Sequence, residues 1–294
     1  MIKIVTATTL PVGSTVALVE LCNQFNARGL ATTLYGPDVW HLDKCAAAAI
    51  DEFRPEKGDV IILNRINLVS LAELDNLPAK IAAAQKPNRF ASLKDALLAS
   101  VPFARKSEAF KLVLTCVGND SCLSQPTRFP LFDKIHLVHA VQRGRRSAPP
   151  SFTCPSFLRD LERSARKPEK VAGVLGSICA SNRVDAAIES AFRDGMATVI
   201  VYGLMSDPVY YYRTIEPLTK GYPGRIKYAG FVTNRQKVYD SVSDVYCAVS
   251  KPGSPVQREC AATNTRFHGP DPADGGHPLS NDQIFEIWKK ELEL

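Results

Sequence analysis

The chain has 294 residues, of which 45% are hydrophobic and 22% charged. This composition excludes disordered, collagen-like and coiled-coil proteins, and the length suits two domains of roughly 140 residues each. No stretch reaches the ~18 uninterrupted apolar residues that a membrane-spanning helix requires, and the apolar run Met1–Val5 is too short for a signal peptide. We therefore expect a cytoplasmic protein without a membrane partner.

The eight cysteines are scattered, without a Cys-x-x-Cys pair or a neighbouring pair of histidines. This spacing does not match a zinc site, and without a secretory signal we expect reduced thiols. The sequence therefore predicts no metal-binding residues.

The net charge of +6 is concentrated in one segment. Between Arg143 and Lys170, eight basic residues stand against three acidic ones, a surplus of +5. A basic stripe of this kind suits a phosphate-rich partner. A solvated linker, with its arginines and lysines lying along the surface, is the alternative interpretation.

In the first half of the chain, apolar runs alternate with segments of helical periodicity. A helix is predicted over Ser14–Ala27, ending at Arg28-Gly29. The predicted strands are Lys3–Ala7, Leu30–Tyr35, Asp59–Asn64, Lys111–Val117 and Lys134–Ala140. Strands separated by helices indicate right-handed crossovers and a parallel sheet.

The alternation breaks over Gln142–Lys170, which is basic and weakly periodic, and then resumes. Helices are predicted at Arg183–Asp194 and Arg235–Val242. The predicted strands are Val171–Leu175, Thr198–Tyr202, Arg225–Tyr228 and Asp244–Val249. Ligands bind outside the carboxyl ends of such strands, so a cleft between the two domains is the expected site.

The last segment, Ser280–Leu294, has the pattern of an amphipathic helix. Ser280 is its predicted N-cap and Gln283 completes a capping box. Its apolar face consists of Ile284, Phe285, Ile287, Trp288 and Leu292. The helix is long enough to lie back across the first domain.

Three common signatures are absent: the Walker lysine loop, Gly-x-Gly-x-x-Gly after the first strand, and the Gly-x-Ser-x-Gly elbow. The candidates that remain lie in the second half. Gly176-Ser177 follows a strand, and Ser181-Asn182-Arg183 opens a helix. Helix-end amides, a serine hydroxyl and an arginine fork can together cradle a diphosphate. Arg183 as an exposed helix residue without a ligand is the alternative.

A second helix start follows Gly253-Ser254 and contains Glu259. A carboxylate at this position can accept hydrogen bonds from both ribose hydroxyls, while nearby amides meet phosphate. The alternative for Glu259 is a favourable interaction with the helix dipole.

Over nearly its whole length the arrangement resembles the two-domain GT-B glycosyltransferases. The segments that carry the resemblance are Val174–Phe192, Val199–Gly203 and Ile226–Val232, and Glu259 falls where the family has its ribose-binding glutamate. The resemblance implies an α/β fold of two Rossmann-like parallel-sheet domains that face each other across a cleft. The acceptor-side domain would span residues 1–155 and the nucleotide-sugar-binding domain 156–275, with a helix at 276–294 that packs back on the first domain.

Among these enzymes the chain is most similar to the small phage DNA glucosyltransferases that modify hydroxymethylcytosine. Their donor loop begins with Gly-Ser and carries an arginine shortly after, as Gly176, Ser177 and Arg183 do here. In the first domain, Val60–Leu68 and Val113–Asp120 resemble their strand–loop segments.

In this comparison Asp120 is the nearest candidate for the catalytic base that deprotonates the acceptor hydroxyl. A retaining enzyme needs no such base. A turn or cap residue is the alternative for Asp120.

Three positions depart from the family pattern. Lys251 stands where a second acid is usual, Asn182 stands where a phosphate-binding lysine is usual, and a second arginine is missing at or near Cys179. These departures leave the donor sugar and the stereochemical outcome open.

The resemblance implies a nucleotide-sugar donor, a UDP-sugar first of all, and no tightly bound cofactor; assistance by Mg²⁺ or Mn²⁺ stays open. The donor-binding residues would be Gly176, Ser177, Asn182, Arg183, Gly253, Ser254 and Glu259. The acceptor would be a hydroxymethylated pyrimidine in double-stranded phage DNA within the host cytoplasm, contacted by Arg143, Arg145 and Arg146. Two alternatives remain: a saccharide, lipid or small-molecule acceptor, and a non-catalytic GT-B-like binding protein.

Overall fold

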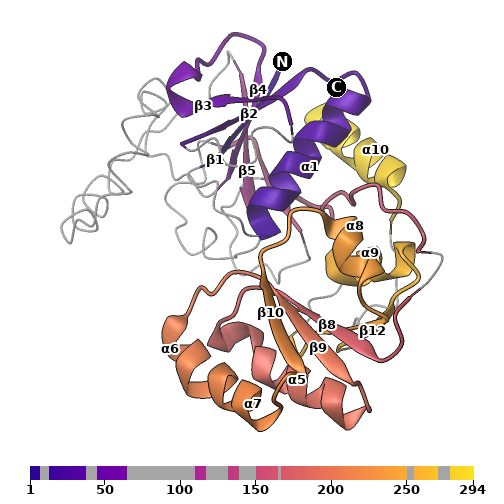
Figure 1. The fold of residues 1–294 in the computed structure, drawn as a ribbon. Helices are drawn as coiled ribbons and strands as arrows, with labels where there is room; N and C mark the ends of the chain where they lie inside the picture. Colours follow the sequence, from indigo (N-terminus) through magenta and orange to yellow (C-terminus); the bar gives the residue numbers. More distant parts are fainter. Residues whose placement is uncertain are drawn as a thin grey trace. The chain divides into compact units, whose positions relative to one another are not determined.

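The structure is a computed structural model that describes residues 1–6, 13–37, 45–64, 110–116, 132–138, 150–164, 167–249, 255–270 and 279–294 (Figure 1). The chain divides into two compact units. Unit 1 comprises Met1–Phe157 and Leu279–Leu294, and unit 2 comprises Leu158–Pro278. Each unit is built on a parallel sheet.

The sheet of unit 1 has seven strands in the order β3-β2-β1-β4-β5-β6-β7, all parallel. Its strands are β1 (Ile2–Thr6), β2 (Thr32–Gly36), β3 (Ala47–Ala49), β4 (Val60–Asn64), β5 (Lys111–Cys116), β6 (Lys134–Leu137) and β7 (Ser151–Thr153). Every residue of β1 and β4 is buried, as expected for central strands covered on both faces. The chain proceeds from β1 to one side of the sheet and then crosses to β4, so the topological switch point lies between β1 and β4.

Two helices, α1 (Gly13–Ala27) and α10 (Asn281–Leu292), pack side by side in unit 1 (Figure 1). Phe25 of α1 meets Trp288 of α10 edge to face at 5.6 Å, and both side chains are buried in one apolar cluster. The predicted capping box of Ser280 and Gln283 is confirmed. The segment farthest along the chain is thus part of the core of unit 1.

Charged side chains hold both ends of α10. At its start, Arg28 lies 2.6 Å from the carboxylate of Asp282. At its end, Lys111 donates to the carbonyl of Leu292 at 3.0 Å, and Lys134 donates to the carbonyl of Glu291. Cations at a helix C-terminus satisfy its last carbonyls and complement its dipole.

The sheet of unit 2 has five parallel strands in the order β10-β9-β8-β11-β12. The strands are β8 (Val171–Leu175), β9 (Thr198–Tyr202), β10 (Ile226–Gly230), β11 (Asp244–Tyr246) and β12 (Arg266–His268). The helices are α5 (Val184–Arg193), α6 (Pro208–Tyr210), the π-helix η6 (Tyr211–Ile215), α7 (Glu216–Gly221), α8 (Arg235–Asp240) and α9 (Pro255–Ala262). One apolar cluster joins α5, η6 and α7 to the sheet, and a second joins α8 and α9 to its other face (Figure 1).

The sequence missed three edge strands of three residues each: β3, β7 and β12. β7 lies inside the segment predicted as a basic linker, and it pairs with β6 through Phe152, which is buried. The continuous segment α6–η6–α7 was not predicted either. Six cysteines are free, as expected for reduced thiols: Cys22, Cys45, Cys154, Cys179, Cys247 and Cys260.

Candidate donor site in unit 2

Two of the predicted donor residues, Gly176 and Ser177, lie at the switch point of the unit 2 sheet. The chain runs from β8 towards β10 on one side and crosses to β11 on the other, so the switch point lies between β8 and β11. Gly176 and Ser177 directly follow β8, and the segment leading to α9 follows β11. The carboxyl edge at such a point is where ligands bind in open α/β sheets.

Three glycines mark this edge. Gly176, Gly203 and Gly230 follow or end the adjacent strands β8, β9 and β10, with φ angles of 146°, 155° and 70°. The amide of Gly176 donates to the carbonyl of Tyr202, and the amide of Gly203 donates to the carbonyl of Gly230, both at 2.9 Å. A Cβ atom on Gly203 would lie 1.9 Å from the carbonyl oxygen of Gly176. The backbones therefore approach too closely for any side chain, and only glycine fits at Gly203.

The loop after β8 forms hydrogen bonds with the loop after β9 and within itself. The backbone amide of Ile178 donates to the carbonyl of Leu204 at 2.8 Å, and the backbone amide of Asp207 donates to the carbonyl of Ile178 at 3.0 Å. The side-chain amide of Asn182 donates to the carbonyl of Ser177 at 2.7 Å. Asn182 thus shapes the loop, although the sequence comparison had placed it at a phosphate-binding position.

Arg183 is the N-cap residue of α5 in a left-handed conformation, with φ 46° and ψ 50°. A non-glycine residue in this conformation costs about 1 kcal/mol or more. Its side chain is exposed and makes no hydrogen bond with the residues that the structure describes. An exposed guanidinium therefore stands where the loop after β8 leads into α5.

The first turn of α5 is less available to a diphosphate than the sequence suggests. The hydroxyl of Tyr210 accepts a hydrogen bond from the amide of Asp185 at 3.0 Å and donates to its carboxylate at 2.7 Å. Burial, partly offset by a backbone amide, raises the pKa of Tyr210 to about 12. The amide of Asp185 is therefore already capped by a protein hydroxyl.

Glu259, in the middle of α9, belongs to a buried polar cluster. Its side chain is 5% exposed, and its Oε2 accepts hydrogen bonds from Arg235 and from the hydroxyl of Tyr239, both on α8. The helix-dipole interpretation is wrong, since Glu259 lies outside the first turn and pairs with a cation. Its other oxygen, Oε1, has no hydrogen-bond partner within the described ranges.

The cluster raises the pKa of both side chains that α8 contributes to it. Burial disfavours the charge of Arg235, but the carboxylate of Glu259 outweighs burial, so the pKa of Arg235 stands above its ordinary value. Burial and the same carboxylate raise the pKa of Tyr239. Tyr239 therefore stays protonated and donates to Glu259.

Part of the predicted basic stripe has a structural role. Arg159 donates to the carbonyl of Thr233 at 2.9 Å, and Lys167 donates to the carbonyl of Tyr239 at 2.6 Å and to the hydroxyl of Thr265 at 2.8 Å. Burial lowers the pKa of Lys167. These two cations tie the segment to the rest of unit 2. Arg163 and Lys170 are exposed.

The remaining predicted site residues lie outside the described residues. They are Asp120, Arg143, Arg145, Arg146, Gly253 and Ser254.

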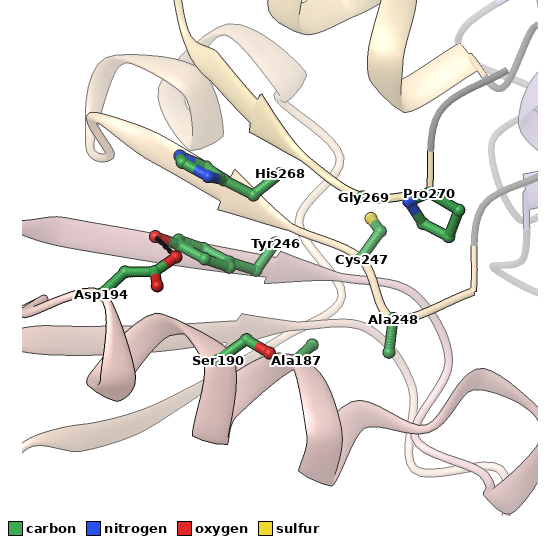
Figure 2. A pocket seen from close by; sticks show the side chains of 9 residues that line it. All are labelled: Ala187, Ser190, Asp194, Tyr246, Cys247, Ala248, His268, Gly269 and Pro270. Carbon is green, nitrogen blue, oxygen red and sulfur yellow. Dashed lines mark hydrogen bonds between the residues drawn. The ribbon is translucent and has the colours of Figure 1, made fainter.

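A separate pocket of about 290 Å³ lies between α5 and the ends of β11 and β12. Figure 2 shows the rings of Tyr246 and His268 one above the other and Asp194 beside the tyrosine hydroxyl. The two rings are stacked, with a centroid separation of 4.3 Å. That hydroxyl donates to Asp194 at 3.0 Å, and burial raises the pKa of Tyr246. None of the predicted donor residues that the structure describes lines this pocket.

Within the described segments, no group of three or more His, Cys, Asp or Glu side chains is placed to hold a metal ion. The helices of those segments are also too short or too polar for any of them to cross a bilayer.

No protein-family model and no curated protein matches the sequence. Solved structures do match. An alpha-glucosyltransferase in complex with UDP has a TM-score of 0.60 at 10% identity, covering 100% of this chain and 91% of that one. HepE of Anabaena in complex with UDP-glucose has a TM-score of 0.58 at 12% identity, with 99% and 89% covered. WaaG, a glycosyltransferase involved in lipopolysaccharide biosynthesis, has a TM-score of 0.51 at 12% identity, with 100% and 91% covered.

These similarities extend over both units, and the three identities of 10–12% are low. They agree with the two parallel Rossmann-like sheets of seven and five strands. The chain has the GT-B fold.

Proposed function

We propose that this chain is a glycosyltransferase that moves a sugar from a nucleotide-diphosphate sugar to a hydroxyl acceptor. The observation that carries the proposal is the carboxyl edge of the unit 2 sheet. The three glycines that mark this edge, the exposed side chain of Arg183 and the buried carboxylate of Glu259 all belong to one GT-B unit. Two structures of the same fold contain UDP or UDP-glucose, which supports a UDP-sugar donor.

On the donor side, we assign the diphosphate to the loop of Gly176 and Ser177 and to the guanidinium of Arg183. Amides of the Gly253-Ser254 segment add to this site, and Asn182 acts by holding the loop in place. The ribose hydroxyls donate to Oε1 of Glu259, since Arg235 and Tyr239 occupy Oε2. Negative charge that develops on the leaving diphosphate is stabilised by fixed amides and a cation, a form of catalysis worth several kcal/mol.

For an inverting transfer, Asp120 takes the proton of the acceptor hydroxyl. The acceptor oxygen then forms a bond to the anomeric carbon, the bond between that carbon and the diphosphate oxygen breaks, and the nucleoside diphosphate leaves. A retaining transfer needs no base at Asp120. The anomeric configuration of the product decides between the two.

The acceptor that we propose is a hydroxymethylated pyrimidine in double-stranded DNA. The support is the charge pattern: Arg143, Arg145 and Arg146 lie in the segment that supplies most of the net positive charge. A saccharide, lipid or small-molecule acceptor is the second candidate, because two of the eight stripe cations are already engaged within unit 2.

Donor binding is tested by calorimetry with UDP. We expect Arg183→Ala to weaken UDP binding by roughly ten- to hundredfold, the effect of losing a charged hydrogen-bond donor. Arg193→Ala is the matched control, because it removes an exposed arginine at the other end of α5. Equal affinity in both variants would contradict the assignment of the diphosphate to Arg183.

Transfer is tested by incubating the protein with hydroxymethylcytosine DNA and a panel of nucleotide sugars, followed by digestion and mass analysis of the nucleosides. A sugar mass gain that disappears in Arg183→Ala supports a DNA glycosyltransferase and identifies the donor. Release of nucleoside diphosphate without a mass gain in DNA moves the acceptor to another class. No release from any donor, despite UDP binding, favours a non-catalytic binding protein. The same assay with EDTA, Mg²⁺ or Mn²⁺ decides whether a divalent ion assists.

A further inference from the structure

Four polar side chains form a row at the carboxyl edge of the unit 1 sheet. Thr6, Asn64, Thr115 and His136 are register partners on the neighbouring strands β1, β4, β5 and β6. All four are buried, with at most 2% of their surface exposed. Register partners on parallel strands face the same side of the sheet. This polar row therefore ends the apolar stripe that packs against α1 and α10.

The hydrogen bonds of the polar row have a fixed direction. His136 lies 2.8 Å from the carbonyl oxygen of Cys154 through Nε2 and 2.8 Å from the hydroxyl of Thr115 through Nδ1. A carbonyl only accepts, so a neutral His136 carries its proton on Nε2 and accepts at Nδ1. The hydroxyl of Thr115 must then donate to Nδ1, and its proton is not available to Asn64.

Asn64 is left with an unpaired oxygen. Its Nδ2 donates to the hydroxyl oxygen of Thr6 at 3.2 Å, which fixes the amide. Its carbonyl oxygen Oδ1 is buried and has no hydrogen-bond partner among the residues that the structure describes. A buried carbonyl without a donor costs free energy, and such a group in a folded protein requires an explanation.

The position of Asn64 offers an explanation for this unpaired oxygen. Thr6 and Asn64 end β1 and β4, the two strands that flank the switch point of the unit 1 sheet. Ligands of parallel α/β sheets bind at this point. The row contains no acidic or basic side chain besides the imidazole, which is engaged on both nitrogens, so the complementary group is a neutral hydrogen-bond donor.

We infer that Asn64 is a specificity-determining residue on the acceptor side, whose Oδ1 accepts a hydrogen bond from a neutral O–H or N–H group of the acceptor. Thr6 is a positioning residue, because it holds the amide through Nδ2. The inference rests on the proposed function, since only a transferase has an acceptor to recognise. A hydroxyl or an exocyclic amine meets the requirement, whereas a carboxylate or phosphate group offers no proton and is rejected.

The first test needs no activity. Asn64→Leu replaces the unpaired amide with an apolar side chain of similar size, and we expect an unchanged or higher Tm. Thr115→Val is the matched control, because it removes an equally buried hydroxyl that is paired with His136, and we expect a lower Tm. Equal losses of Tm in the two variants would show that Oδ1 is already paired in the free protein, which overturns the inference.

The second test measures transfer from UDP-glucose to hydroxymethylcytosine DNA. For Asn64→Leu we expect about a tenfold higher KM for the DNA, the effect of one hydrogen bond to a ligand. The KM for UDP-glucose and the release of UDP without acceptor should stay unchanged. An unchanged KM for the DNA overturns the inference while leaving the proposed function intact. A wild-type protein that releases no UDP at all contradicts the proposed function and removes the acceptor role of Asn64 with it.

Discussion

Arg235 and Glu259, 24 residues apart in sequence, form a buried ion pair between α8 and α9. The guanidinium bonds to Oε2 through both Nε and Nη2, and Tyr239 donates to the same oxygen. This leaves the carboxylate with one oxygen engaged by the protein and one that we assign to the ribose. The pair therefore links the packing of two helices to the geometry of the donor site.

Removing either member of this ion pair should destabilise the folded protein. We expect Arg235→Met or Glu259→Leu to lower the free energy of unfolding by about 3 kcal/mol, because each leaves a buried charge without its partner. The combined variant Arg235→Met/Glu259→Leu should lose less than the sum of the two. Urea unfolding of the four proteins measures this coupling, and additive losses would contradict it. UDP binding should be weakened in each variant that lacks the Glu259 carboxylate, including the double variant.

At Gly203, the cost of a steric clash with Gly176 can be distinguished from the cost of a positive φ angle. We expect Gly203→Ala to lower the free energy of unfolding by more than about 2 kcal/mol, since its Cβ would overlap a backbone carbonyl. Gly195→Ala is the control: Gly195 also has a positive φ, 83°, but nothing lies within 4 Å of an added Cβ. The control should cost only about 1 kcal/mol. Thermal and urea unfolding give both values, and equal costs would mean that strain alone matters.

The ionised carboxylate of Asp244 stabilises unit 2, and this contribution is lost at acid pH. Burial alone would raise its pKa, but hydrogen bonds from Arg266, Ser243 and His268 outweigh burial and hold the pKa at about 2. A depressed carboxyl pKa stabilises the folded state above about pH 4 and loses this contribution as the pH falls to about 2.

The measurement is urea unfolding of the wild type and of Asp244→Asn from pH 7 to pH 2. We expect the wild type to be more stable by about 2 kcal/mol near pH 6, with the difference shrinking between about pH 4 and pH 2. A difference that does not change over this range would contradict the role of the ionised carboxylate.

The packing of α10 predicts that the C-terminal helix stabilises unit 1. Trp288 is 1% exposed and contacts Phe25, Phe152 and His136. We expect Trp288→Ala to lower the free energy of unfolding by about 3–5 kcal/mol, the usual cost of removing a buried aromatic side chain. Lys289→Ala, at the exposed neighbouring position, should change it by less than about 0.5 kcal/mol. Denaturation followed by far-UV circular dichroism compares the two.

The sequence predicted the central strands well for a physical reason. β1, β4, β8 and β9 are five-residue strands in which apolar residues predominate, and strands covered on both faces have this composition. The three-residue strands were missed because they carry no such run. β12 contains Arg266 and His268, which are held in place by Asp244 of the neighbouring strand and not by burial.

The candidate site was predictable only in part. Gly176, Ser177 and Arg183 could be singled out because a loop after a parallel strand is where ligands bind, and the structure places them at the switch point. Nothing in the sequence indicated that Tyr210 caps the amide of Asp185, or that Asn182 bonds to the carbonyl of Ser177. These contacts depend on how the loops fold against one another.

By itself, the sequence determined the α/β alternation, the capped C-terminal helix and the positions of the loops that follow the central strands, because apolar periodicity and capping act over neighbouring residues. Only the tertiary structure decided which polar groups meet. It paired Glu259 with Arg235, committed two of the stripe cations to unit 2, and aligned Thr6 with Asn64 at the edge of the sheet. These pairings join residues between 24 and 98 positions apart, and strand order and register, which no local pattern specifies, bring them together.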